Sequence, residues 1–371
     1  MRVLFIALSF LIWVPVASAT PEAKKKTVAM LISSHAKNKE DKLSYDLEEL
    51  AQAYLILHEH DVNIDILSPE GGSVFVKNNK DHLDYIQRFK TKTPALKKLA
   101  STISTKKAVL QKYDAVFVVG GDGAMFDLPF DKYTQSLLSH FAQGNKPIAA
   151  VCHGPAALIN VALENGEFFI KNKKVNAFTN REEKAFGSDV IDALPFLLED
   201  KLKQRGAAFV SNAPMLPYVA VDGNLITAQN PGAVGQATEA LIMKMGVAVK
   251  PRTLYKDEAT LMLVSQARKA GSYLIHLAMH KNPGKYDTNY LALYGFYAYA
   301  LAQTKEDKKT ELELMEAIAE YADHPVYMEK MIAAQWEQGD RTKAEKNIKQ
   351  LKLKFPKHSV SDSLVKMLTD K

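Results

Sequence analysis

The stretch that decides the fold is Ile148–Ile159, "IAAVCHGPAALI", which contains the only cysteine among the 371 residues. Four apolar residues before Cys152 are typical of a buried strand, and the run from Gly154 favours a helix with a proline in its first turn. Cys152 and His153 therefore occupy a sharp strand-to-helix turn, which is the geometry of a nucleophile elbow. Because a helix N-terminus stabilises a thiolate, we predict that the pKa of Cys152 lies below that of a free thiol. The alternative is a buried structural cysteine.

The region around this turn alternates strand and helix patterns. Strands rich in β-branched residues are expected at residues 27–33, 62–68, 113–120 and 147–151, with amphipathic helices between them, such as 45–58 and 133–143. This alternation predicts an α/β domain over residues 26–248, a flavodoxin-like parallel sheet sandwiched by helices, with ligands beyond the carboxyl ends of the strands.

Two further segments of this domain are distinctive. Residues 219–229 predict a β-hairpin, because Asp222-Gly223 supplies the positive φ angles of a tight turn. Residues 71–112 are the least regular and carry many lysines. We expect them to form an insertion or cap near the first two strands.

Helical periodicity replaces strand patterns after Lys250, which predicts a separate all-α domain over residues 251–371. The helical segments are 258–279, 289–303, 311–321, 326–337 and 342–354. Gly339, Ala344 and Pro356 have the mutual spacing of a tetratricopeptide helix pair, and Trp336 and Leu351 fall on packing positions. A single such pair leaves a tetratricopeptide-like domain and a plain helical bundle both open.

Composition and the N-terminus narrow the functional class. The net charge of +6 comes from scattered lysines with few interleaved aromatic residues, so nucleic-acid binding is not expected. Residues 1–19 combine Arg2, an apolar run and Ala17-Ser18-Ala19, the pattern of a cleaved signal peptide. We expect an exported protein, periplasmic or secreted, with no stable membrane insertion after cleavage. A retained membrane anchor is the alternative.

Five motifs resemble the ThiJ/PfpI superfamily, which has a class I glutamine amidotransferase-like fold. In chain order they are "GGDGAMFDLP" (120–129), "AAVCHGPAAL" (149–158), "AFTNREEKAFG" (177–187), "PFLLEDKLKQRGA" (195–207) and "DGNLITAQNPGA" (222–233). Their order is most similar to the branch that contains the glutathione-independent glyoxalases and related heat-shock chaperones.

The resemblance implies a set of catalytic residues. Cys152 matches the family nucleophile and His153 the histidine that follows it. Glu49 matches a glutamate whose carboxyl group hydrogen-bonds the thiol, and Glu183, with Glu182 as the fallback, matches the acid that orients the histidine. A carboxyl group beside a thiolate stays protonated and relays protons, and the histidine serves as acid and base.

The pocket is expected to begin at Gly120 and Gly121, which with the backbone N–H of His153 are placed for an oxyanion hole. The family usually has Gly-Gly-His-Gly where this chain has Gly-Gly-Asp122-Gly123. An acid at this position disfavours anionic substrates and raises nearby pKa values. No cofactor and no metal site are expected, since His58 and His60 stand two residues apart and point to different sides of a helix.

These residues lead to three hypotheses. The first is a cofactor-free enzyme that converts small α-oxoaldehydes such as methylglyoxal to 2-hydroxy acids, with Cys152 forming a hemithioacetal and Glu49 and His153 moving protons. The second is a holdase chaperone that binds unfolded or partner peptides on the helical domain. The third is an amidase or peptidase of the same superfamily. Its glutamine-amidotransferase version is disfavoured, because no His-x-Glu occurs near the end of the α/β domain. The oligomeric state is left open, a homodimer included.

Overall fold

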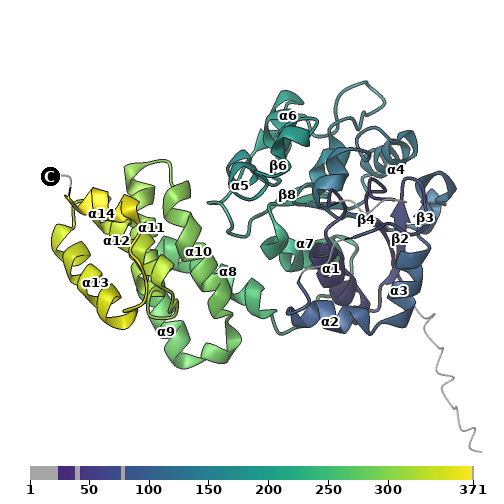
Figure 1. Ribbon diagram of the computed structural model, residues 1–371. Coiled ribbons are helices and arrows are strands. Elements are labelled where there is room, and N and C mark those ends of the chain that lie inside the picture. The colour runs from purple at the N-terminus through teal and green to yellow at the C-terminus, as the bar shows by residue number, and fades with distance from the viewer. Residues whose placement is uncertain (1–23, 38–41, 77–79, 370–371) are drawn as a thin grey trace, which may run out of the picture.

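A computed structural model describes residues 24–37, 42–76 and 80–369, and these form an α/β part followed by a run of helices (Figure 1). The signal peptide expected at residues 1–19 lies outside the described residues. Within the described ranges, none of the helices has the length and apolar character needed to span a bilayer.

A mostly parallel sheet forms the centre of the α/β part. Its strand order is β3-β2-β1-β4-β5-β9-β8, and only β8 and β9 pair antiparallel. The strands are β1 (Thr27–Leu31), β2 (Asn63–Ser68), β3 (Ile103–Ser104), β4 (Ala115–Val118), β5 (Ile148–Val151), β8 (Val219–Asp222) and β9 (Leu225–Ala228). A separate short pair consists of β6 (Lys174–Val175) and β7 (Ala208–Phe209). The predicted fold class is confirmed.

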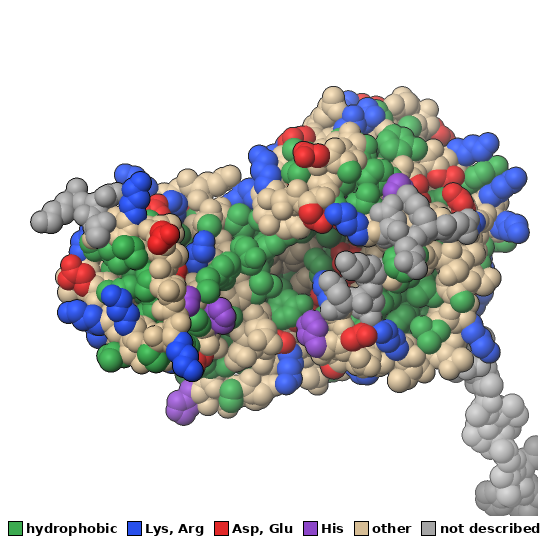
Figure 2. Space-filling view, viewed as in Figure 1, with side chains coloured by type: hydrophobic (Ala, Val, Ile, Leu, Met, Phe, Trp, Pro, Cys, Tyr) green, Lys and Arg blue, Asp and Glu red, His purple; other side chains and the backbone are tan. Residues whose placement is uncertain are grey.

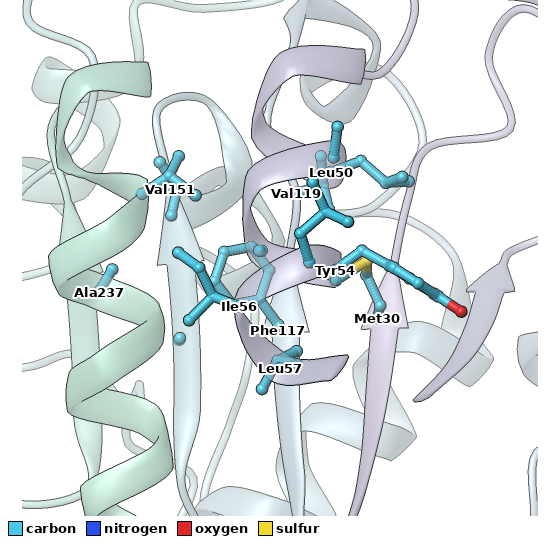
Figure 3. Close-up of a cluster of buried hydrophobic side chains, with 14 of the residues drawn as sticks. Met30, Leu50, Tyr54, Ile56, Leu57, Phe117, Val119, Val151 and Ala237 are labelled. Carbon is cyan, nitrogen blue, oxygen red and sulfur yellow. The ribbon is translucent and has the colours of Figure 1, made fainter. Parts of the chain in front are cut away.

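Helices cover both faces of the sheet, because alternate strand residues are apolar on each side. On one face, α1 (Leu47–Glu59) and α7 (Val234–Lys244) pack on the strands. Figure 3 shows Tyr54 and Ile56 of α1 and Ala237 of α7 beside Met30, Phe117 and Val151 of the sheet. The other face carries α4 (Lys132–Gln143) and α6 (Leu198–Gln204). The carboxyl ends of β4 and β5 stay uncovered by these layers and carry the loops described below.

The irregular segment 71–112 contains α2 (Asp84–Lys90), α3 (Thr93–Ala100), strand β3 and two short 3₁₀ turns, Thr105–Lys107 and Leu110–Lys112. Strand β3 extends the sheet beside β2, and α2 packs on α1 through Phe89 and Tyr54, whose ring centroids are 5.4 Å apart. The segment therefore lies beside the first two strands, as predicted.

The hairpin of β8 and β9 is present, with its turn one residue later than predicted. Asp222 belongs to β8 and pairs with Leu225, so the turn residues are Gly223 and Asn224. Gly223 has a positive φ of 60°, whereas the φ angle of Asp222 is not positive. Strand pairing thus continues through Asp222 because glycine alone supplies the unusual backbone angle.

Helices continue to the end of the described chain. They are α8 (Lys256–Ala270), α9 (Tyr273–Lys281), α10 (Thr288–Leu301), α11 (Lys305–Ile318), α12 (Pro325–Glu337), α13 (Arg341–Lys354) and α14 (Asp362–Thr369), with a 3₁₀ turn at Pro283–Lys285. The expected segment 258–279 is two helices, because Gly271 with a φ of 121° ends α8. The predicted helix pair is α12 and α13, and Ala344 and Leu351 of α13 are buried in the cluster that the two helices share. A tetratricopeptide-like array remains a prediction.

Candidate active site

Cys152 lies at the end of β5 in a strained backbone conformation, with a positive φ of 57°. Its N–H donates to the Ala228 carbonyl at 2.8 Å, and its own carbonyl accepts from the Phe178 N–H at 2.9 Å. Neighbouring glycines let the backbone segments around Cys152 pack this closely. A Cβ on Gly120 would lie 2.6 Å from the Val151 carbonyl oxygen, and a Cβ on Gly154 would lie 2.7 Å from the Val118 carbonyl oxygen. The turn therefore has the backbone of a nucleophile elbow.

The helix expected after the elbow is shorter than predicted. Gly154–Leu158 forms one 3₁₀ stretch, so the aligned peptide dipoles of a full α-helix are missing. The thiol is also buried. Burial, together with the nearby carboxyl groups of Glu49, Asp46 and Asp122, raises the pKa of Cys152 well above its usual value. The prediction of a lowered thiol pKa is wrong.

Glu49 reaches the thiol from the first turn of α1. The Asp46 side chain caps this helix by accepting from the N–H groups of Glu48 and Glu49. The Glu49 carboxyl accepts from the Gly120 N–H at 2.7 Å and shares a hydrogen bond with Cys152. Its Oε1 is buried with no partner among the described residues. Burial, and next the Asp46 charge, raise the pKa of Glu49 well above its usual value, which favours the protonated carboxyl group.

His153 connects the thiol to two acids. Its Nδ1 lies 3.5 Å from the Cys152 Sγ and 3.7 Å from the Asp122 Oδ1, and its Nε2 lies 2.7 Å from the Glu183 Oε2. Burial opposes a charged imidazole, but the Glu183 hydrogen bond and the Asp122 charge outweigh it and raise the pKa of His153. The ring is therefore a good acceptor for the thiol proton.

The acid that contacts His153 is Glu183, and the fallback Glu182 has a different role. Thr179 caps α5 (Asn180–Phe186) with Glu182 as the reciprocal partner of its capping box. The Glu182 carboxylate also accepts from the Met215 N–H at 2.8 Å and the Asn230 side chain at 2.9 Å. Glu182 thus holds the loops around the site together.

The expected oxyanion hole is only partly available. The Gly120 N–H is occupied by Glu49, so its assignment as an oxyanion donor is wrong. In the described part of the chain no acceptor pairs with the N–H of Gly121 or of His153. Gly123 donates its N–H to the Ser44 carbonyl and serves the loop instead. Two backbone donors therefore remain for a substrate oxygen.

Asp122, His153 and Glu183 also have the close spacing of a possible metal-ligand group, with one ligand atom from each within 4.8 Å of the others. His153 faces the two acids with opposite ring nitrogens: its Nε2 is at hydrogen-bond distance from Glu183, and its Nδ1 faces Asp122 at ion-pair distance. His60 is used elsewhere: its Nδ1 lies 2.7 Å from the Ile56 carbonyl oxygen, and its Nε2 accepts from the Lys250 N–H.

Sequence reasoning missed two residues that shape this site. Asp46 places Glu49 and adds negative charge near the thiol, and its position before a helical run is an N-cap signal that could have identified it. Phe178 packs its ring 4.8 Å from the His153 ring. Nothing in its local pattern distinguishes Phe178 from an ordinary core residue.

Known proteins are similar to this chain over its α/β part. "Glutamine amidotransferase-like class 1 domain-containing protein 1" of Bos taurus is 29% identical over 185 residues, 50% of this chain and 81% of that protein. "Glutathione-independent glyoxalase HSP31" of Saccharomyces cerevisiae is 33% identical over 163 residues, 42% of this chain and 66% of that protein. The crystal structure of Rapid Encystment Protein 24 KDa of Francisella tularensis is 33% identical, with a TM-score of 0.55 over 59% of this chain and 99% of that one.

The sequence profile of the DJ-1/PfpI family matches residues 44–244. This range is more than half of the chain and contains the elbow, Glu49 and Glu183. The chain therefore belongs to the DJ-1/PfpI family.

Proposed function

We propose that this protein converts small α-oxoaldehydes to 2-hydroxy acids without glutathione or another cofactor. The observation that carries the proposal is the buried Glu49 carboxyl group against the thiol of the only cysteine. Burial favours the protonated form of this carboxyl group, and its Oε1 has no other partner in the described chain, so we assign to it the proton that goes to the carbonyl oxygen. Relatives named glutathione-independent glyoxalases support the same reaction.

The first step forms a hemithioacetal. The Cys152 Sγ attacks the aldehyde carbon C1 while His153 takes the thiol proton and Glu49 gives its proton to the C1 oxygen. We assign the N–H groups of Gly121 and His153, which have no acceptor among the described residues, to that oxygen. The step leaves an imidazolium between Asp122 and Glu183, which offset its charge.

The second step moves hydrogen from C1 to C2. The Glu49 carboxylate removes the C1 proton, a C1–C2 double bond forms, and His153 protonates the C2 oxygen to give an enediol. Glu49 then returns its proton to C2 while the C1 hydroxyl proton goes to His153, which leaves a thioester. Water adds to C1, its proton goes to Glu49, and the Cys152 sulfur leaves with the proton of His153. Substrate and one water give one 2-hydroxy acid.

Asp122 favours neutral substrates. Its side chain is 29% exposed and lies beside the imidazole, so its carboxyl group meets any molecule that approaches His153. Burial raises the pKa of Asp122, and the His153 charge opposes that shift. An uncharged α-oxoaldehyde avoids the repulsion that a carboxylate substrate would meet there.

A turnover assay tests the reaction. The protein should convert methylglyoxal to lactate, Cys152→Ala should abolish conversion, and Glu49→Gln should reduce it by about 10²-fold or more. Glu167→Gln is the matched control, because Glu167 is exposed and pairs only with neighbours on its own loop. The proposal fails if no lactate forms, or if Cys152→Ala converts methylglyoxal as fast as the unchanged protein.

A further inference from the structure

A cavity of about 290 Å³ lies where the α/β part meets the helices. Figure 2 shows the surface hollowed between these two parts, with hydrophobic side chains around the hollow. Its α/β wall includes Phe178 and Met215, and its helical wall includes Leu261 of α8 with Tyr290 and Leu293 of α10. The catalytic proposal above does not use this space.

The cavity adjoins the candidate active site through Phe178. The Phe178 ring lines the cavity and lies 4.8 Å from the His153 ring, while its N–H donates to the Cys152 carbonyl. Two further lining residues, Asn230 and Gly232, follow the carboxyl end of β9, the strand that pairs with β5. The cavity is therefore at the carboxyl edge of the sheet, one aromatic ring away from the imidazole.

The helical wall is an addition to the family domain, because the family profile ends at Lys244, before α8 begins. Polar and aromatic contacts hold this wall in place. The Tyr85 hydroxyl lies 2.9 Å from both the Glu48 and the Asp257 carboxyl groups, and the Phe186 and Tyr297 rings meet at 5.2 Å. Leu261 packs closely on Gly232: a Cβ added to Gly232 would lie 2.8 Å from the Leu261 Cδ1.

The lining suits an uncharged apolar group. Aromatic and aliphatic side chains form most of the surface, and the charged groups on it are three acids, Glu48, Glu182 and Asp257, with Lys80. Lys80 pairs with Glu48, so an anionic group would meet the remaining acids. A cavity of roughly 150 Å³ already accommodates benzene, so this one has room for an aryl ring or a short alkyl chain.

We propose that this junction cavity binds the substituent of the substrate, so that the protein prefers α-oxoaldehydes that carry an aryl ring or a longer alkyl chain to methylglyoxal. Helices α8 and α10 are then the specificity elements of the enzyme. The proposal rests on the function proposed above for the reacting group, and its test is arranged so that the two can fail separately.

Alkylation of Cys152 tests the cavity without any turnover, since the chain has one cysteine. N-benzyl iodoacetamide should alkylate Cys152 on the order of tenfold faster than iodoacetamide, beyond the ratio for a free thiol, because its ring reaches the cavity. Leu293→Trp, which narrows the cavity, and Tyr290→Ala, which removes an aromatic wall, should each reduce this preference. The iodoacetamide rate should stay unchanged in both, which shows that the fold is intact.

Leu277→Trp is the matched control, because Leu277 is 59% exposed on α9 and does not line the cavity. It should keep the full preference for the benzyl reagent. In the turnover assay, kcat/KM for phenylglyoxal should exceed that for methylglyoxal. Leu293→Trp should lower kcat/KM for phenylglyoxal more than kcat/KM for methylglyoxal.

The outcomes separate the two proposals. The assignment of the cavity is overturned if N-benzyl iodoacetamide has no rate advantage over iodoacetamide beyond that for a free thiol, or if the advantage survives both cavity variants. This holds even if methylglyoxal is converted. A benzyl preference that both variants reduce, without turnover of either aldehyde, supports the cavity and overturns the glyoxalase reaction.

Discussion

At the scale of residues, the site is a buried cluster of acids around one thiol and one imidazole. Burial, and next the carboxyl groups of Glu49, Asp46 and Asp122, raise the pKa of Cys152, which favours the protonated thiol at rest. The raised pKa of His153 makes transfer of that proton to the ring easier. The cluster therefore favours proton transfer at the moment of attack over a preformed thiolate.

Asp122→Asn tests this electrostatic arrangement. Removing the negative charge should lower the pKa of both Cys152 and His153, since a nearby anion favours the protonated form of each group. The pH dependence of iodoacetamide alkylation reports the thiol, and NMR titration of the imidazole protons reports the ring. Asp61→Asn is the control, because Asp61 is exposed and pairs with Lys250. Unmoved titrations in Asp122→Asn would show that this carboxylate does not act on the pair.

At the scale of elements, α10 is apolar on nearly all of its sides, and contacts with neighbouring helices hold it in place. Tyr294 donates to the Glu311 carboxylate of α11 at 2.8 Å, and Glu311 also pairs with Arg268 of α8. Gly295 lets α12 approach, because the buried Tyr327 ring packs directly over it. A glycine in the middle of a helix thus has a packing role.

Gly295→Ala should destabilise the helical part. Alanine would gain about 1 kcal/mol from helix propensity, but its Cβ would lie 2.1 Å from the Tyr327 hydroxyl, which donates to the Met315 carbonyl. Overpacking of a buried contact costs about 1–3 kcal/mol, so the clash wins. Thermal unfolding followed by circular dichroism should give a midpoint lower by a few degrees. Gly284→Ala, whose nearest atom is 3.8 Å away, should leave the midpoint unchanged.

At the scale of the whole molecule, one tyrosine links three separate segments. The Tyr85 hydroxyl of α2 lies between Glu48 of α1 and Asp257 of α8, and it can donate to only one of them. Burial, and next the Glu48 charge, raise the pKa of Asp257 to about 7. A protonated Asp257 completes the set of hydrogen bonds, which joins the α/β part to the helices.

This contact should make the junction pH-dependent. The pKa of Asp257 is about 7 when folded and about 3.9 when unfolded, so folding takes up a proton in that window. The stabilisation is complete below about pH 4 and is lost as the pH rises through 7. Hydrogen exchange of α8, corrected for intrinsic rates, should be slower at pH 5.5 than at pH 8. Asp257→Asn should remove this difference.

Asp127→Asn is the control for that experiment. Burial also raises the pKa of Asp127 to about 7, but its carboxylate accepts from the Ser34 N–H within the α/β part. This variant should leave the pH dependence of α8 intact. An equal loss in both variants would place the pH effect outside the junction.

Much of the fold and part of the site follow from local patterns. Short apolar runs ending in glycine, serine or cysteine predicted β1, β2, β4 and β5, because a buried parallel strand leaves a nearly continuous apolar signature. The family motifs led to Glu49 and Glu183, which the structure brings to Cys152 and His153. The length of the helix after the elbow was misjudged, since "GPAALINVAL" has helical propensity but tertiary packing ends the 3₁₀ stretch at Leu158.

The sequence by itself determined the turn at the end of β5, the strands and helices that alternate in the α/β part, and the helical C-terminal part, because each of these elements follows from residues within a few positions of one another. Only the tertiary structure decided the direction of the thiol pKa, the use of the Gly120 N–H by Glu49 and the junction cavity. Each of these depends on groups far apart in the chain, such as Glu49 and Cys152 or Phe178 and Tyr290. Burial and Coulomb interactions act through space, and no local pattern records which distant charges share a site.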